Sequence, residues 1–262
     1  MKTGYAAALA LVAVLGSGCG GGPTNTVTTT ATPAGSGTAS AQVSGEVTVL
    51  AAASLTKPLT ALADTYEATH PGVTVRLSFG SSTTLAQQVA QGADADLLAT
   101  AGTAALARLG DENPTETTTI ARNILEIATP PDDPANVASL ADLARPDVQV
   151  VLCAASVPCG KAAAEVLAKA GIAANVVSRE VDVSATLAKV TLGEADAAVV
   201  YHSDVVSARG SVRGVEIPAD QNTTVTYPLA RFGDDAAARD FAAYVAGPEG
   251  LAALTAAGFL AP

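Results

Sequence analysis

Two serines occupy matching positions in the chain, each where an apolar, strand-like run changes into a helical pattern. Ser54 ends the run VTVLAAAS, and Ser82 ends the run LSFGSS. In an open α/β sheet, such junctions lie at the carboxyl ends of strands, where helix N-termini present unpaired N–H groups. A hydroxyl beside these amides can bind an anion, although the commonest role of a serine there is to cap the helix. Taken alone, either serine fits both interpretations.

The elements that must position these serines alternate along the chain. Apolar residues at three- to four-residue spacing follow the first apolar run, which is typical of an amphipathic helix, and short buried runs recur between such segments. The pattern predicts strands at residues 47–51, 73–79, 95–100, 124–128, 148–153, 176–181 and 197–201, and helical segments at 55–66, 85–91, 104–109, 161–170, 184–192 and 239–258. A capping-box pattern of Ser139 and Asp142 predicts a further short helix. This repeated alternation predicts an α/β fold with a parallel sheet, built as two similar lobes.

Composition and charge exclude several classes of protein. Hydrophobic residues make up 49% of the 262 residues and charged residues 15%, which excludes a chain that is disordered throughout. The formal net charge of −11 argues against a nucleic acid or an anionic membrane surface as a partner. Aromatic residues account for only 3% and there is no Trp, so stacking on bases or sugar rings is not expected.

The N-terminal segment has the pattern of an export signal. Lys2 precedes a ten-residue apolar stretch that ends at Leu15, which is too short to span a bilayer, and small residues then lead to Cys19. We therefore expect a signal peptide at residues 1–18 and lipidation of Cys19, with ordinary secretion as the alternative. Residues 19–45 contain hardly any large apolar side chain, and we expect them to form a flexible tether on the extracytoplasmic side of the cell membrane.

Removing Cys19 leaves an even pair of cysteines in an exported protein. Cys153 and Cys159 lie in the sequence CAASVPC. An even number of cysteines in this compartment favours a disulfide between them. The alternative is two unrelated buried thiols.

Six motifs, in this order, carry a resemblance to a known family: AAASLT, SFGSSTTLA, GADADLL, VPCGKAAAEVL, VDVSATLAKV and AVVYHSDV. Together they resemble the substrate-binding proteins of bacterial molybdate ABC importers, which have the two-lobed type II periplasmic-binding fold with the ligand cleft between the lobes. The resemblance extends from Val47 to Tyr227-Pro228 and more weakly to the C-terminus. It implies a first lobe of residues 46–123 and 222–262 and a second lobe of residues 124–221. From its helical pattern, we expect the C-terminal segment, interrupted at Gly247-Pro248, to pack against the first lobe.

The resemblance also implies a set of anion-binding residues. Ser54, with its own amide, Ser82 and the phenol of Tyr201 match the family's hydroxyl ligands, and Cys159 and Val183 match its backbone N–H donors. The family more often has Ala where Cys159 stands. The implied ligand is molybdate or tungstate, held as an oxyanion without direct metal ligands or a cofactor, and the implied partner is a membrane permease. We expect a monomer that is not an enzyme and does not bind nucleic acid.

A donor-only site explains the residue types physically. Hydrogen bonds to charged groups contribute about 1.5–3 kcal/mol each, so several neutral donors can hold a dianion without Lys or Arg. Such a site leaves the proton of hydrogen phosphate without an acceptor, whereas sulfate must be excluded by cavity size. Lys57 and Lys161 follow two of the motifs and could lie near the anion, but a solvated side chain is the simpler interpretation.

Two alternatives remain. The same fold could bind sulfate, phosphate, a phosphonate or an organic acid, although no motif that carries a ligand contains the Arg that a carboxylate would need. A secreted hydrolase could use Ser54, Ser82 or Cys159 as a nucleophile, but each would need a base within reach, and His70 and His202 are the only histidines. The sequence also lacks a GxSxG motif.

Overall fold

The computed structural model describes residues 43–262; the predicted signal peptide, Cys19 and the predicted tether as far as residue 42 lie outside the described residues. The strands are β1 (Gly45–Ala52), β2 (Val73–Gly80), β3 (Leu97–Ala99), β4 (Glu116–Thr129), β5 (Val150–Cys153), β6 (Val176–Glu180), β7 (Ala197–Tyr201), β8 (Arg213–Glu216) and β9 (Thr224–Arg231). The α-helices are α1 (Thr56–Thr69), α2 (Ser82–Ala90), α3 (Pro158–Ala170), α4 (Val183–Thr191), α5 (His202–Ala208), α6 (Ala236–Ala246) and α7 (Pro248–Ala256). Short 3₁₀ helices are η1 (Ala53–Leu55), η2 (Thr103–Arg108) and η3 (Leu140–Ala144).

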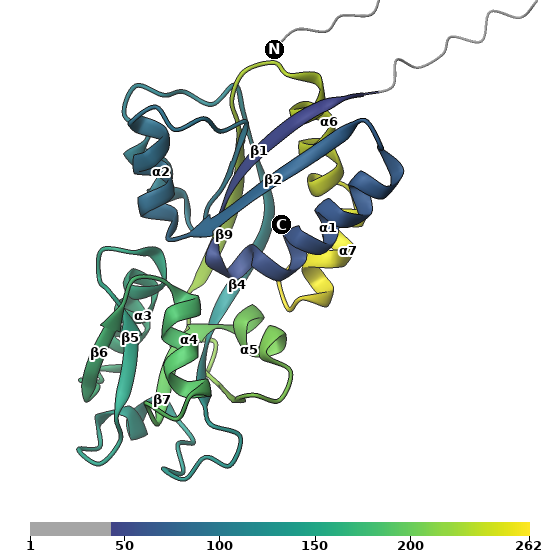
Figure 1. Cartoon of the computed structure of the whole chain (residues 1–262). Helices are drawn as coiled ribbons and strands as arrows, with labels where there is room; N and C mark the ends of the chain where they lie inside the picture. Colours follow the sequence, from purple (N-terminus) through teal and green to yellow (C-terminus); the bar gives the residue numbers. More distant parts are fainter. Residues whose placement is uncertain (1–42) are drawn as a thin grey trace, which may run out of the picture. The chain divides into compact units, whose positions relative to one another are not determined.

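The strands follow the order β2-β1-β3-β9-β4-β7-β5-β6, with β8 paired to β4 (Figure 1). β1 is parallel to β2 and β3, and β5 is parallel to β6 and β7, as the alternation of strands and helices predicts. The centre of the sheet differs from the prediction, because β9 is antiparallel to β3 and β4 is antiparallel to β9, β7 and β8. The sheet is therefore mixed rather than parallel throughout.

The long strand β4 joins two lobes. Its residues Glu116–Ile124 pair with β9, whereas Leu125–Ala128 pair with β7. Lobe 1 contains β1, β2, β3 and β9 with α1, α2, α6 and α7, and lobe 2 contains β5, β6, β7 and β8 with α3, α4 and α5 (Figure 1). This is the predicted two-lobed α/β architecture. The division at residues 123/124 and 221/222 stays a prediction. Gly45, the last residue of the predicted tether, belongs to β1.

The core of lobe 1 follows from the spacing of apolar residues in α1. Leu59, Leu62 and Tyr66 recur on one face of the helix and are fully or almost fully buried. Burial of each large apolar side chain contributes about 1.5–3 kcal/mol to the free energy of folding. The ring of Tyr66 lies 5.0 Å from that of Phe241 in α6. The C-terminal helices thus pack on lobe 1, as predicted, with a break at Gly247-Pro248.

Four features differ from the sequence prediction. The first half of β4 escaped the prediction because residues 116–119 are exposed and carry no apolar pattern. β9 contains Pro228, which is unusual inside a sheet; opposite it, β4 has a bulge between Thr119 and Ala121. β8, which is only four residues long, is absent from the predicted strands. α5 begins at His202, directly after β7, and is absent from the predicted helical segments. None of the helices in the described part of the chain has the length and apolar character needed to cross a membrane.

Candidate anion-binding site

The carboxyl ends of the parallel strands in both lobes meet at one cavity. It encloses about 230 Å³ of empty space, which includes its opening to solvent. The wall is formed by Ala52, Ala53, Ser54, Gly80, Ser81, Ser82 and Ala101 from lobe 1 and by Val157, Pro158, Cys159, Asp182, Val183 and Tyr201 from lobe 2. All five predicted ligand residues therefore lie together on this wall. Their role as ligands remains a prediction.

Neither predicted serine caps its helix. The Ser54 Oγ lies 2.9 Å from the phenol oxygen of Tyr227, and the Ser82 Oγ accepts a hydrogen bond of 2.9 Å from the N–H of Ala101. Because the Ala101 amide already occupies a lone pair of Ser82, the hydroxyl hydrogen of Ser82 is free to point elsewhere. Both hydroxyls are buried and lie on the cavity wall. The contacts of these two serines are therefore not those of helix caps, the alternative interpretation of the sequence.

Two helices of lobe 2 begin at the cavity. Cys159 is the second residue of α3, and Val183 is the first residue of α4. The N–H groups of these positions have no partner within their own helices, so they are available to an anion. Gly160 explains how α3 comes so close to the loop after β5, because a Cβ there would lie 2.0 Å from the carbonyl oxygen of Ala154. The glycine of the VPCG motif therefore fixes the position of the Cys159 amide.

Tyr201 ends β7 and is almost completely buried. Its hydroxyl has no hydrogen-bond partner among residues 43–262. Burial, with a further contribution from the neighbouring Tyr227 phenol, raises the pKa of Tyr201 well above its ordinary value. The two rings are 6.0 Å apart in an edge-to-face arrangement. The phenol therefore stays protonated at physiological pH and can act as a donor.

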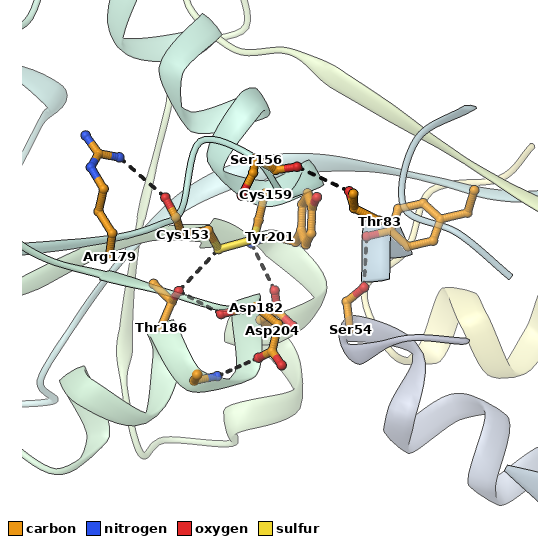
Figure 2. The surroundings of a disulfide bond; sticks show 12 residues. Ser54, Thr83, Cys153, Ser156, Cys159, Arg179, Asp182, Thr186, Tyr201 and Asp204 are labelled. Atoms are coloured by element: carbon orange, nitrogen blue, oxygen red, sulfur yellow. Dashed lines mark hydrogen bonds between the residues drawn. A yellow bond between two sulfur atoms is a disulfide. The ribbon is translucent and has the colours of Figure 1, made fainter. Parts of the chain in front are cut away.

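Cys153 and Cys159 form a disulfide, which joins the end of β5 to the first turn of α3 (Figure 2). The Cys153 sulfur lies 3.2 Å from the Thr186 hydroxyl, and this hydroxyl donates to the carbonyl oxygen of Asp182 at 2.8 Å. The contacts link the starts of α3 and α4, the two helices whose amides face the cavity. The pair of cysteines is thus placed where it can fix the Cys159 amide.

The charged groups near the cavity are acidic rather than basic. Asp182 lies on the wall, and its Oδ1 accepts the N–H of Ala185 at 2.9 Å, which caps α4. Asp204 is buried behind Tyr201 and accepts the Tyr201 N–H at 3.0 Å. Burial raises the pKa of Asp204 to about 7; the Tyr201 N–H opposes the rise, and the charge of Asp182 adds to it.

Neither of the two lysines considered above lies on the cavity wall. The Lys57 Nζ donates to the carbonyl oxygen of Ser207 in α5, and Lys161 lies on the wall of a neighbouring hollow. No Lys or Arg is among the described residues that line the cavity. An anion would therefore be held by hydroxyl and amide donors.

The two histidines make their contacts elsewhere in the described chain. His70 stacks on Tyr66 with ring centroids 4.0 Å apart, and His202 Nδ1 lies 2.6 Å from Glu126 Oε2. Within the described chain, neither hydrogen-bonds to Ser54 or Ser82, and Cys159 is held in the disulfide. No cluster of three His, Cys, Asp or Glu residues that could hold a metal ion occurs among residues 43–262.

Sequence reasoning missed several residues of the site. Tyr227, which supports Ser54, lies in the unpredicted strand β9, and Ala101, which supports Ser82, lies after β3. The sequence indicates Asp182 as a helix cap, since Asp is a common N-cap residue. Its place on the cavity wall depends on the approach of the two lobes, which the sequence does not indicate. Ser81 stands beside Ser82 in the FGSST motif and also lines the cavity.

Fold and cavity together define a class: a two-lobed α/β binding protein whose ligand site lies between the lobes. The family model for the bacterial extracellular solute-binding protein matches residues 47–260. The chain belongs to that family. It is 38% identical over 229 residues to the molybdate-binding protein ModA of Mycobacterium tuberculosis, an alignment that covers 84% of this chain and 87% of that protein.

Two of the solved structures that share the fold bear on the choice of ligand. The periplasmic molybdate-binding protein of Azotobacter vinelandii superposes with a TM-score of 0.73 at 21% identity, covering 82% of this chain and 99% of that chain. The sulfate-binding protein SubI of Mycobacterium tuberculosis gives a TM-score of 0.71 at 20% identity, covering 82% of this chain and 86% of that chain. Because proteins named for two different oxyanions share this architecture, the fold alone does not identify the ligand.

Proposed function

We propose that this protein is the extracytoplasmic binding component of an ABC importer and captures molybdate, and tungstate with it. The observation that carries the proposal is the set of donors on one cavity wall: the hydroxyls of Ser54, Ser82 and Tyr201 and the amides of Cys159 and Val183. The 38% identity to a molybdate-binding protein over most of both chains supports this choice of ligand.

The donors are prepared for an acceptor-only ligand. The phenol of Tyr201 is buried without a partner in the described chain, and burial keeps it protonated. A tetrahedral dianion offers lone pairs in many directions and no proton. Hydrogen bonds to a charged group contribute about 1.5–3 kcal/mol each, so this set can bind a dianion tightly without a cationic side chain.

The carboxylate of Asp182 bears on selectivity. It would repel an anion, but its Oδ1 is engaged with the Ala185 N–H, which holds the side chain on the cap of α4. Because this carboxylate is already engaged as the cap of α4, we expect hydrogen phosphate, whose proton needs an acceptor, to bind more weakly than a fully ionised oxyanion. Sulfate is fully ionised but smaller, so we expect it to leave the donors too far away for good hydrogen bonds.

Ligand binding is proposed to hold the two lobes together. Thr83 of α2 in lobe 1 donates to the carbonyl oxygen of Ser156 in lobe 2 at 3.3 Å (Figure 2). Lys57 of lobe 1 donates to the carbonyl oxygen of Ser207 in lobe 2. Further polar contacts between the lobes include the hydrogen bond of 2.8 Å from the Thr223 hydroxyl to Glu165 Oε1 in α3. An anion that touches donors from both lobes stabilises the closed state by its higher affinity for that state. The permease could recognise this closed form.

The N-terminal predictions complete the proposed role. Membership of an extracellular solute-binding family supports an extracytoplasmic location. We propose removal of residues 1–18, lipidation of Cys19 and attachment to the cell membrane through residues 19–45. Cys19→Ala should release the protein from membranes into the soluble fraction, as measured by fractionation and immunoblotting. Equal membrane partitioning of the variant and the wild type would contradict lipidation.

We further propose that the protein acts as a monomer. We also propose that it is not an enzyme, since no described histidine is hydrogen-bonded to Ser54 or Ser82. Calorimetric titration with molybdate, tungstate, sulfate and phosphate tests the proposed function. We expect 1:1 binding of molybdate and tungstate. Equal affinity for sulfate or phosphate would favour another oxyanion as the ligand.

A further inference from the structure

Buried side-chain nitrogen and oxygen atoms without a hydrogen-bond partner are few in the described part of the chain. Among residues 43–262 they are the hydroxyl oxygens of Ser81 and Tyr201 and the Nε of Arg231. Ser81 and Tyr201 both lie on the wall of the anion cavity, one in each lobe, whereas Arg231 lies outside it. A buried hydroxyl without a partner destabilises the protein, so such groups are usually satisfied by protein, water or ligand. Two of them on one cavity wall point to a ligand that satisfies both.

Ser81 does not perform the usual function of a serine at its position. It is the N-cap residue of α2, with the extended backbone typical of an N-cap (φ −65°, ψ 127°), yet its side chain makes no capping hydrogen bond. Elsewhere in the described chain, Asp235 caps α6 through the N–H of Ala238. The Ser81 hydroxyl thus leaves the free amides of α2 unused and lies beside them.

The Ser81 hydroxyl also differs from those of its neighbours. Ser82 Oγ accepts from Ala101, and Ser54 Oγ pairs with Tyr227. Each of these contacts fixes the direction of the serine. Ser81 has no such contact, so no group among residues 43–262 competes with an anion for its proton.

We propose that Ser81 is a further ligand, whose hydroxyl donates a hydrogen bond to the bound oxyanion as the third hydroxyl donor of lobe 1. This inference rests on the proposed function, because it assumes an oxyanion in the cavity. Ser81 and Ser82 then hold the anion from adjacent positions at the start of α2, opposite Tyr201. The FGSST motif supplies two hydroxyl ligands rather than one.

The test compares variants that lack the Ser81 hydroxyl. Ser81→Ala should raise the Kd for molybdate about tenfold or more, because one hydrogen bond to a charged ligand is lost. The melting temperature of the ligand-free variant should equal or exceed that of the wild type, because a buried unpartnered hydroxyl is removed and no capping bond is lost. Ser81→Gly should weaken binding in the same way, which guards against an effect specific to Ala.

Thr84→Ala provides the matched control. Thr84 lies in the same first turn of α2 but is exposed and does not line the cavity, so its removal should leave the Kd unchanged. If both Ser81 variants bind molybdate as tightly as the wild type, Ser81 is not a ligand, while the proposed function stands. If the wild type itself does not bind molybdate, the proposed function fails and the inference fails with it.

Discussion

Replacing Tyr201 by Phe removes a single oxygen atom from the cavity and leaves the ring in place. The phenol is almost completely buried and finds no partner in residues 43–262, so it is free to donate to an anion. Loss of one hydrogen bond to a charged ligand costs about 1.5–3 kcal/mol, which corresponds to a roughly 10- to 100-fold rise in the Kd for molybdate. Titration calorimetry measures this change directly.

In the ligand-free protein, the same substitution should leave the stability unchanged or raise it. A buried hydroxyl without a partner costs about 1–3 kcal/mol, so Tyr201→Phe should not lower the melting temperature and could raise it by several degrees. At equal ligand concentration, the stabilisation by molybdate should be smaller in the variant, because this stabilisation depends on the ratio of ligand concentration to Kd. Tyr244→Phe, at a tyrosine of α6 that does not line the cavity, is the control and should leave the Kd unchanged. If Tyr201→Phe binds as tightly as the wild type, Tyr201 only packs against Tyr227 and the assignment of the ligands of lobe 2 is wrong.

Two further predictions concern the surroundings of the site. The pKa of Asp204 is raised from 3.8 to about 7, so its stabilising contribution is complete below pH 3.8 and is lost as the pH rises through about 7. Asp204→Asn should therefore reduce the fall in the free energy of unfolding between pH 5 and pH 8, measured by urea denaturation; an identical fall in both proteins would contradict a protonated Asp204. The disulfide of Cys153 and Cys159 spans a sequence separation of 6, for which loop entropy gives about 2 kcal/mol of stabilisation. The double variant Cys153→Ala/Cys159→Ala, or the reduced wild type, should lose about this amount in urea denaturation and bind molybdate more weakly, and unchanged stability and affinity would show that the disulfide does not support the loop.

The sequence predicts those parts of the fold that depend on local patterns. The spacing of Leu59, Leu62 and Tyr66 predicts the buried face of α1, and these side chains are buried. The strand-to-helix junctions at Ser54 and Ser82 predict where a cavity lies, because the carboxyl ends of parallel strands meet there. Both predictions require only a few neighbouring residues.

The remaining features depend on contacts between distant segments. β9 carries Pro228, which argues against a central strand, and only the bulge in β4 opposite it shows how the sheet accommodates the residue. The support of Ser54 by Tyr227 joins positions 173 residues apart, which no local pattern indicates. Ser81 and Ser82 are chemically identical in the sequence. Only the burial and the partners of their hydroxyls distinguish them.

The central claim is that the hydroxyl and amide donors of this cavity, whose described wall contains no Lys or Arg, select a large tetrahedral dianion. Calorimetric titration of the purified wild-type protein with molybdate, followed by the same titration in the presence of a large excess of sulfate, tests it most directly. We predict one molybdate bound per chain, with an affinity that excess sulfate leaves essentially unchanged. Binding of sulfate with equal affinity, or no heat of binding with molybdate, would contradict this account.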